Sequence, residues 1–230
     1  MKEWIKKRIA EISLKAAITS FLFIAALFIF GFIADEIVLE NEDLFDSRVF
    51  HFFKNNTGPR FVQVMRFITF FGSSYFLFPA YTLLISYLLI KRQRQNAIDV
   101  LIIALSSTAL MFAFKIFFHR HRPDLPLFKA LTNYSFPSGH ALSSFIFCSV
   151  LIFLIRKGNL AAKWKWALSV LLIFFSIAIG ISRIVLRYHY ASDVLAGFCL
   201  GFAWVLFSLW LQKKISKKAL APEMINHTGH

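Results

Sequence analysis

The chain has 230 residues, of which 58% are hydrophobic and 29 are phenylalanine, and its formal net charge is +14 at pH 7. Sixteen of the 26 Lys and Arg residues fall into four clusters beside long apolar runs, at 2–15, 91–94, 156–165 and 213–218. Basic residues placed in this way are typical of the cytoplasmic loops of membrane proteins, so we exclude nucleic acid as a partner. Cys148 and Cys199 both lie inside apolar runs, which predicts neither a disulfide framework nor a metal-type cysteine site.

Apolar runs of about 20 residues, the length that crosses a bilayer, occur six times. They predict spans at roughly 14–34, 66–90, 97–118, 140–156, 165–183 and 190–212. Gly72-Ser73-Ser74 interrupts the second run, so the alternative there is an interfacial helix over 59–71 and a span that begins near Ser74. We therefore expect an all-α, polytopic membrane bundle that forms a single domain over 1–230, with its chemistry between 115 and 193.

The segment between the first two spans, 35–60, differs from the rest of the chain. Six of the twelve acidic residues lie in it (Asp35, Glu36, Glu40, Glu42, Asp43 and Asp46), followed by aromatic and apolar residues at helical spacing. This pattern predicts an amphipathic helix at the membrane surface. Such a helix could act as a lid over a lipid site, although most such helices only seal a bundle.

The basic clusters also predict the topology. They place both termini and the second and fourth connections in the cytoplasm, which agrees with an even number of spans. The remaining connections then face outward, and they include all three charged stretches described next, at 115–123, 137–140 and 182–193. Ionisable groups beside membrane spans usually mark a functional site, so we expect one shared site at the outer face.

The first stretch contains Lys115 and Arg122, which are seven residues apart, followed by Pro123. If the third span continues that far, this spacing places both cations on one helical face, about 10 Å apart along the axis. A lysine that merely extends to the interface is the alternative for Lys115, but Arg120 and Arg122 already occupy that position.

The second stretch, Pro137-Ser138-Gly139-His140, opens the fourth span. Ser138 is a favourable N-cap, and Gly139 allows a ligand to approach the backbone closely. Free N–H groups and the helix dipole make such a terminus suitable for an anion. An ordinary helix start is the alternative for this tetrapeptide when it is taken by itself.

The third stretch places Arg183 at the end of the fifth span and His189 and Asp193 at the start of the sixth. The spacing of four residues between His189 and Asp193 predicts that the imidazole and the carboxylate share a helical face. A carboxylate that holds one ring nitrogen leaves the other free to attack, although a structural His–Asp pair remains the alternative.

Taken together, the three stretches read K-x6-R-P, P-S-G-H and S-R-x5-H-x3-D. This combination resembles the signature of the type-2 phosphatidic acid phosphatase superfamily, the lipid phosphate phosphatases, and in particular its compact bacterial PgpB-type members. The resemblance implies that His189 attacks phosphorus and forms a phosphohistidine, that Asp193 orients His189, and that His140 protonates the leaving oxygen. It further implies that the phosphoryl oxygens are held by Lys115, Arg122, Ser138, Gly139 and Arg183.

Three fixed cations can stabilise a phosphoryl transition state, so we expect a metal-independent enzyme with no cofactor. The expected substrate is a lipid phosphate: phosphatidylglycerophosphate, hydrolysed to phosphatidylglycerol, or alternatively undecaprenyl diphosphate, or both. The expected location is the cell membrane, with the site extracytoplasmic. The oligomeric state is not determined by the sequence, which is compatible with a monomer. A transporter would carry charges toward both faces, and a soluble haloperoxidase with a similar anion pocket would lack the six spans.

The neighbours of the motifs carry weaker predictions. His119, Arg120, His121 and Arg187 extend the basic patch, and interfacial solvation is favoured for them over contact with a lipid head group. Tyr134 and Phe136 either border the pocket or act as interface aromatics. The glycosylation patterns at Asn55 and Asn133 are interpreted as chance matches.

Overall fold

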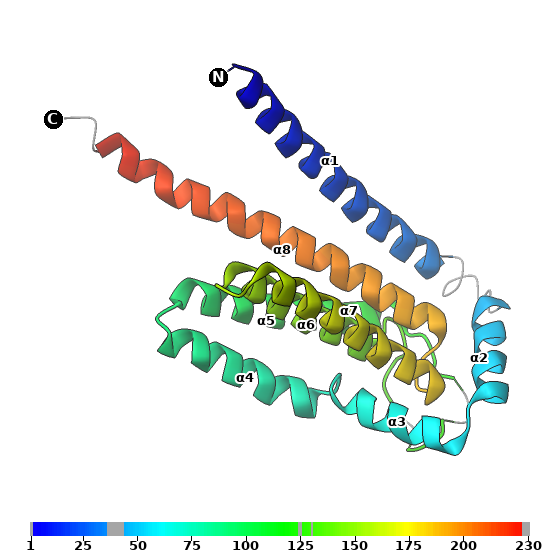
Figure 1. Ribbon diagram of the computed structural model, residues 1–230. Helices are drawn as coiled ribbons and strands as arrows, with labels where there is room; N and C mark the ends of the chain where they lie inside the picture. Colours follow the sequence, from blue (N-terminus) through cyan, green and yellow to red (C-terminus); the bar gives the residue numbers. More distant parts are fainter. Residues whose placement is uncertain (1, 36–43, 124–125, 130, 227–230) are drawn as a thin grey trace.

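The computed structural model describes residues 2–35, 44–123, 126–129 and 131–226, and these residues form eight helices (Figure 1). The helices are α1 (Lys2–Phe32), α2 (Leu44–Asn56), α3 (Pro59–Phe70), α4 (Ser74–Ile90), α5 (Arg94–Phe118), α6 (Gly139–Lys157), α7 (Ala162–Val185) and α8 (Ala191–Asn226). Five spans are long and apolar enough to cross a membrane by themselves, and α3 with α4 makes a sixth that is bent by 40°. The prediction of a polytopic helical membrane bundle is confirmed.

The bend between α3 and α4 falls at Gly72-Ser73, where the sequence predicted an interruption. Gly72 is required there because a Cβ would lie 2.6 Å from Cγ2 of Ile179 and 3.0 Å from Cδ2 of His140. The break therefore lets α3 pack against α7 and brings this part of the chain next to His140.

Consecutive spans run in opposite directions, so their connections gather at two ends of the bundle (Figure 1). α1 lies along α8, α6 packs against both α7 and α8, and α4 packs against α5. The start of α1 and the end of α8 lie at one end, together with the α4–α5 connection, whereas α2 and α3 lie at the other (Figure 1). Large apolar side chains such as Phe28 and Phe78 are more than 70% exposed, as expected of faces that contact lipid.

The segment between α5 and α6 is anchored in the apolar core. Phe136 is fully buried, and its ring centroid lies 4.9 Å from that of Phe118 and 5.6 Å from that of Phe30. It belongs to a cluster that continues along α6 and α8 through Leu142, Ile146, Ala196 and Leu200. Phe136 is therefore a core residue and does not lie at the interface.

Helix α2 confirms only part of what the sequence predicted for 35–60. A helix does form, but Asp46 in its first turn is 1% exposed and does not face the surface. Residues 36–43, which carry Glu36, Glu40, Glu42 and Asp43, lie outside the described residues.

Candidate active site

The three charged stretches meet at the end of the bundle where α5 and α7 end and α6 and α8 begin. Lys115, in the last turn of α5, is 6% exposed and turns inward. Its Nζ donates hydrogen bonds to the carbonyl oxygens of Tyr134 (2.5 Å) and Ser135 (3.3 Å). A lysine that extended to the membrane surface would be exposed, so this alternative is excluded by the burial.

Arg122 lies beyond the end of α5, so the condition under which it would share a helical face with Lys115, a helix that continues to residue 122, is not met. The helix ends at Phe118 because His119 adopts the left-handed conformation, with φ of 49°. Arg122 reaches the site from the following loop, held by the Asn133 carbonyl and side chain (2.8 and 2.7 Å) and by the Tyr188 carbonyl (2.5 Å). Burial lowers the pKa of Arg122 below its usual range, and the guanidinium remains charged at neutral pH.

His189 and Asp193 lie next to each other, but His189 precedes α8, which begins at Ala191. The His189 Nδ1 to Asp193 Oδ2 distance is 3.3 Å, and both side chains are buried. On its other edge, Nε2 lies 3.1 Å from Arg122 Nη1. A guanidinium can only donate, so Nε2 accepts this hydrogen bond and the ring proton is on Nδ1, facing the carboxylate.

The charge state of His189 follows from its surroundings. Burial, followed by the positive charges of Arg122, Arg183 and Lys115, holds the pKa of His189 well below its usual range. The imidazole is therefore neutral at pH 7, with the lone pair of Nε2 directed toward Arg122. This is the protonation state that a nucleophilic histidine needs.

Arg183, in the last turn of α7, is 3% exposed. Its Nη1 donates to Thr69 Oγ1 of α3 (2.8 Å), and its guanidinium stacks on the Tyr188 ring at 4.4 Å from the centroid. Among the described residues, the buried side-chain atoms without a hydrogen-bond partner are Arg183 Nε and Ser138 Oγ. Such atoms normally find a partner, and both belong to residues predicted to hold a phosphate.

Ser138 is the N-cap of α6, as predicted, with extended backbone geometry and no capping hydrogen bond from its hydroxyl. Its N–H donates to the Asp193 carbonyl (3.0 Å), which joins the start of α6 to the start of α8. His140 lies one residue inside α6, within electrostatic range of His189, Arg183, Arg122 and Lys115. Gly139 leaves no space for a side chain, because a Cβ would lie 2.6 Å from Met111 Sδ.

Residues 96–217, more than half of the chain, match the profile of the PAP2 superfamily. The chain belongs to the PAP2 superfamily. Its fold resembles the crystal structure of a transmembrane PAP2-type phosphatidylglycerolphosphate phosphatase from Bacillus subtilis, with a TM-score of 0.78 and 25% identity over 85% of this chain and 98% of that one.

Two curated relatives add to this comparison. Phosphatidylglycerophosphatase B of Bacillus subtilis is 27% identical over 69% of this chain and 79% of the relative. Undecaprenyl-diphosphatase of Sulfolobus acidocaldarius is 27% identical over 71% of this chain and 76% of the relative. As a member of the PAP2 superfamily with these relatives, the chain is a membrane lipid phosphate phosphatase.

This PAP2 site contains side chains that the sequence analysis did not select. Ser135 is fully buried, its hydroxyl donates to Asp193 Oδ2, and it lies 3.3 Å from His189 Nδ1. Asn133 and Thr69 hold Arg122 and Arg183. Buried small polar residues carry no distinct sequence pattern, and the sequence marks Asn133 and Ser135 only through a glycosylation pattern interpreted as a chance match.

The prediction for Arg120 was wrong. Its side chain is only 11% exposed and forms ion pairs with Asp46 and Asp193, both at 2.7 Å, so it is not solvated at the interface. By contrast, His119 and His121 are exposed, and Arg187 packs over the Phe50 ring of α2 at 5.4 Å.

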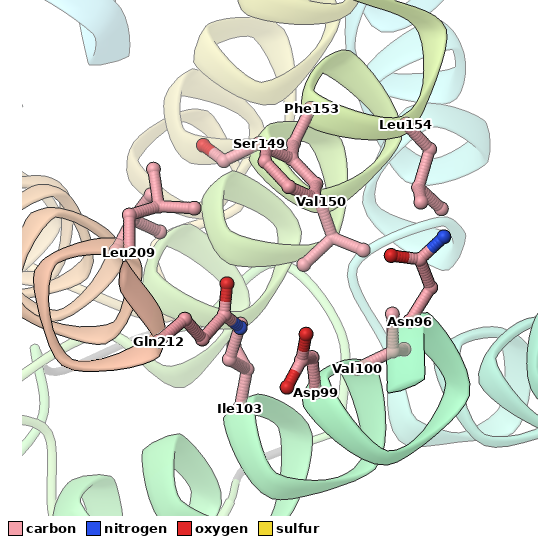
Figure 2. Close-up of a pocket in the computed structure, with 11 residues that line it drawn as sticks. Asn96, Asp99, Val100, Ile103, Ser149, Val150, Phe153, Leu154, Leu209 and Gln212 are labelled. Carbon is pink, nitrogen blue, oxygen red and sulfur yellow. The ribbon is translucent and has the colours of Figure 1, made fainter. Parts of the chain in front are cut away.

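The PAP2 bundle has a small pocket at the end of α5 opposite Lys115. Figure 2 shows this small pocket between α5, α6 and α8, with Asn96, Asp99 and Gln212 beside mainly apolar side chains. None of the eight predicted site residues lines it. Asp99 is about 24 Å from Lys115 along the helix axis, so the pocket is separate from the candidate active site.

Proposed function

We propose that the chain releases orthophosphate from phosphatidylglycerophosphate at the outer face of the cell membrane, through a phosphohistidine at His189. The observation that carries the proposal is the buried His189–Asp193 pair, with Nδ1 3.3 Å from the carboxylate and Nε2 3.1 Å from Arg122. The fold similarity and the name of the Bacillus subtilis relative support this choice of substrate.

In the first step, the lone pair of His189 Nε2 attacks phosphorus while the bond from phosphorus to the lipid oxygen breaks. His140 gives its proton to the departing oxygen, so it must enter the reaction protonated, a form that the negative charge of the bound phosphate favours. Lys115, Arg122 and Arg183, with Ser138 and the N–H of Gly139, hold the non-bridging oxygens. These donors stabilise the charge in a site whose geometry is already fixed.

In the second step, water attacks phosphorus, and His140, now neutral, accepts a proton from it. The phosphorus–nitrogen bond breaks, the electron pair returns to Nε2, and orthophosphate leaves. Asp193 keeps the proton on Nδ1 in both steps and stabilises the positive ring that forms between them.

Undecaprenyl diphosphate is the second candidate substrate, favoured by the name of the Sulfolobus relative. The same attack applies to its terminal phosphate, with lipid monophosphate as the leaving group. The test is phosphate release by the purified protein on each lipid, with His189→Ala as the matched variant. We expect release from phosphatidylglycerophosphate with the higher kcat/KM and none from His189→Ala. Phosphate release by folded His189→Ala would contradict the assignment of His189 as the nucleophile. A higher kcat/KM for undecaprenyl diphosphate would contradict the choice of phosphatidylglycerophosphate as the substrate.

We further propose that this reaction needs no divalent metal, because the three cations supply the charge that metal ions supply in other phosphoryl transfers. Phosphate release in EDTA should equal phosphate release in Mg²⁺, because chelation would remove no catalytic group. Loss of phosphate release in EDTA with recovery on Mg²⁺ addition would contradict this proposal.

Two structural proposals accompany this function. One is that residues 1–230 form a single domain. The other is that both termini are cytoplasmic and the site is extracytoplasmic. The basic clusters support this orientation, because 91–94 joins α4 to α5 and 156–165 joins α6 to α7. Both connections lie at the ends of α5 and α6 that are remote from Lys115 and His140. Lipid phosphate and the surrounding membrane lipids are the partners that this arrangement requires.

A further inference from the structure

Helix α2 is fastened to the candidate active site through one carboxylate, that of Asp46. Its Oδ1 accepts the N–H of Ser192 (2.8 Å), and its Oδ2 accepts the Ser192 hydroxyl and Arg120 Nη2 (2.7 Å). Ser192 is the second residue of α8, where a backbone N–H has no acceptor within its own helix. Asp46 therefore caps α8 from a different helix, at the end where a negative charge is most favourable.

Arg120 joins this carboxylate to the one beside His189. Its Nη2 binds Asp46, and its Nη1 binds Asp193 Oδ1 (2.7 Å) and Ser192 Oγ (2.8 Å). The guanidinium lies over the Tyr190 ring, 4.2 Å from the centroid. A planar guanidinium with two nitrogens on one edge suits two carboxylates in this way, and a lysine does not.

The two oxygens of Asp193 consequently have different partners. Oδ1 binds Arg120, whereas Oδ2 faces His189 Nδ1 and accepts the Ser135 hydroxyl and the Tyr190 N–H (3.0 Å). Arg120 thus fixes the rotation of the carboxylate. Without it, Asp193 could turn away from His189 and release the ring proton that keeps Nε2 free.

We propose that Asp46 and Arg120 are positioning residues of the phosphatase reaction: Asp46 holds Arg120, Arg120 holds Asp193, and Asp193 holds His189 with Nε2 toward phosphorus. The inference rests on the proposed function and deepens it, because it makes the docking of α2 a condition for the reactivity of His189. Neither residue belongs to the three motifs. Both are at most 11% exposed, and among the described residues each forms ion pairs only within this chain of contacts.

The first test is Asp46→Asn, which keeps an oxygen for the Ser192 N–H but removes the charge that holds Arg120. We measure kcat and KM for phosphate release and the apparent Tm in detergent. The expected result is a fall in kcat of about tenfold to a hundredfold, by analogy with the removal of groups that orient metal-ligating side chains. KM should stay unchanged, because Asp46 is not among the groups that bind the substrate. A purely structural role would instead lower Tm and leave the kcat of the folded protein unchanged.

The matched control is Asp99→Asn, the same change at the half-buried carboxylate in the pocket of Figure 2. It should retain the kcat of the wild type. Arg120→Lys should also lower kcat, and Asp46→Asn/Arg120→Lys should lose less than the product of the two single effects, because both changes break the same chain of contacts.

The outcomes separate this inference from the proposed function. Suppose that the wild type and Asp99→Asn are active and that folded Asp46→Asn has the kcat of the wild type. This result would overturn the positioning role of Asp46 and Arg120 but leave the proposed function intact. If Asp46→Asn does not fold, Arg120→Lys decides: reduced kcat at unchanged Tm supports the inference, and unchanged kcat overturns it. Absence of phosphate release by the wild type on both lipids would overturn the proposed function, and the inference with it.

Discussion

Ser135 shows how much of this site depends on a single hydroxyl. It is fully buried, and its oxygen lies between the Asp193 carboxylate, to which it donates, and Nδ1 of His189 at 3.3 Å. Its backbone also takes part, since its carbonyl accepts from Lys115 and its N–H donates to the Arg120 carbonyl (2.8 Å). The hydroxyl therefore fixes the carboxylate, while the backbone contacts the Lys115 ammonium and the main chain at Arg120.

Ser135→Ala should lower kcat by about tenfold, because Asp193 loses one of the hydrogen bonds that orient it, and the backbone contact to the Lys115 ammonium should keep KM near its original value. Ser144→Ala is the control: Ser144 is equally buried, but its hydroxyl binds the Ala141 carbonyl within α6 (3.3 Å). Steady-state phosphate release from both variants provides the comparison. Equal kcat in the two would show that the Ser135 hydroxyl does not orient Asp193.

The lowered pKa of His189 also affects stability. The unfolded chain binds a proton at this histidine below its ordinary pKa of about 6.5, whereas the folded protein does not until a lower pH. The folded state is therefore destabilised as the pH falls below about 6.5. The apparent Tm of the substrate-free protein should decrease from pH 7.5 to pH 5, and His189→Asn should reduce this decrease. The control is His51→Asn, at an exposed position of α2. Its apparent Tm should fall between pH 7.5 and pH 5 by as much as that of the wild type.

At the scale of the helices, the site depends on the close approach of α6 and α8. Gly197 faces the first turn of α6, where a Cβ would lie 2.8 Å from the Ser138 carbonyl oxygen and 3.2 Å from Cβ of Ala141. The neighbouring hydrogen bond from the Ser138 N–H to the Asp193 carbonyl depends on the same spacing. The start of α6, predicted to bind phosphate, is thus held against the start of α8 by the lack of a side chain at Gly197.

Gly197→Ala should destabilise the protein by about 1–3 kcal/mol, the usual cost of overpacking, because its nearest contact is a backbone atom that cannot turn away. Moving α8 outward would also displace Asp193 from Ser138, so kcat should fall together with the apparent Tm. Gly31→Ala in α1 is the control, since a Cβ there meets nothing within 4 Å. A Tm for Gly197→Ala that matches Gly31→Ala would show that α6 and α8 tolerate a wider spacing.

For the molecule as a whole, the sequence predicted those features that repeat or that lie close together in the chain. The apolar runs predicted the spans, and Gly72-Ser73 predicted the break between α3 and α4. The contact of Asp46 with Arg120 could not be predicted, because it joins residues 74 apart and Asp46 resembled its acidic neighbours. The predicted end of the third span at 118 agrees with the end of α5, but the sequence left open whether the helix continues to Arg122. It does not continue, because His119, neither Gly nor Pro, adopts the left-handed conformation.

The proposed orientation of the whole molecule can be tested by labelling single cysteines in intact cells. The background carries Cys148→Ala and Cys199→Ala, which removes both free thiols. Thr132→Cys then reports on the α5–α6 connection, and Asn159→Cys reports on the α6–α7 connection. Both positions are exposed. The basic residues beside Asn159 should hold its connection in the cytoplasm. A membrane-impermeant maleimide should therefore label Thr132→Cys in intact cells, and Asn159→Cys only after permeabilisation. The reverse pattern would place the site on the cytoplasmic face and would require the lipid phosphate to be hydrolysed there.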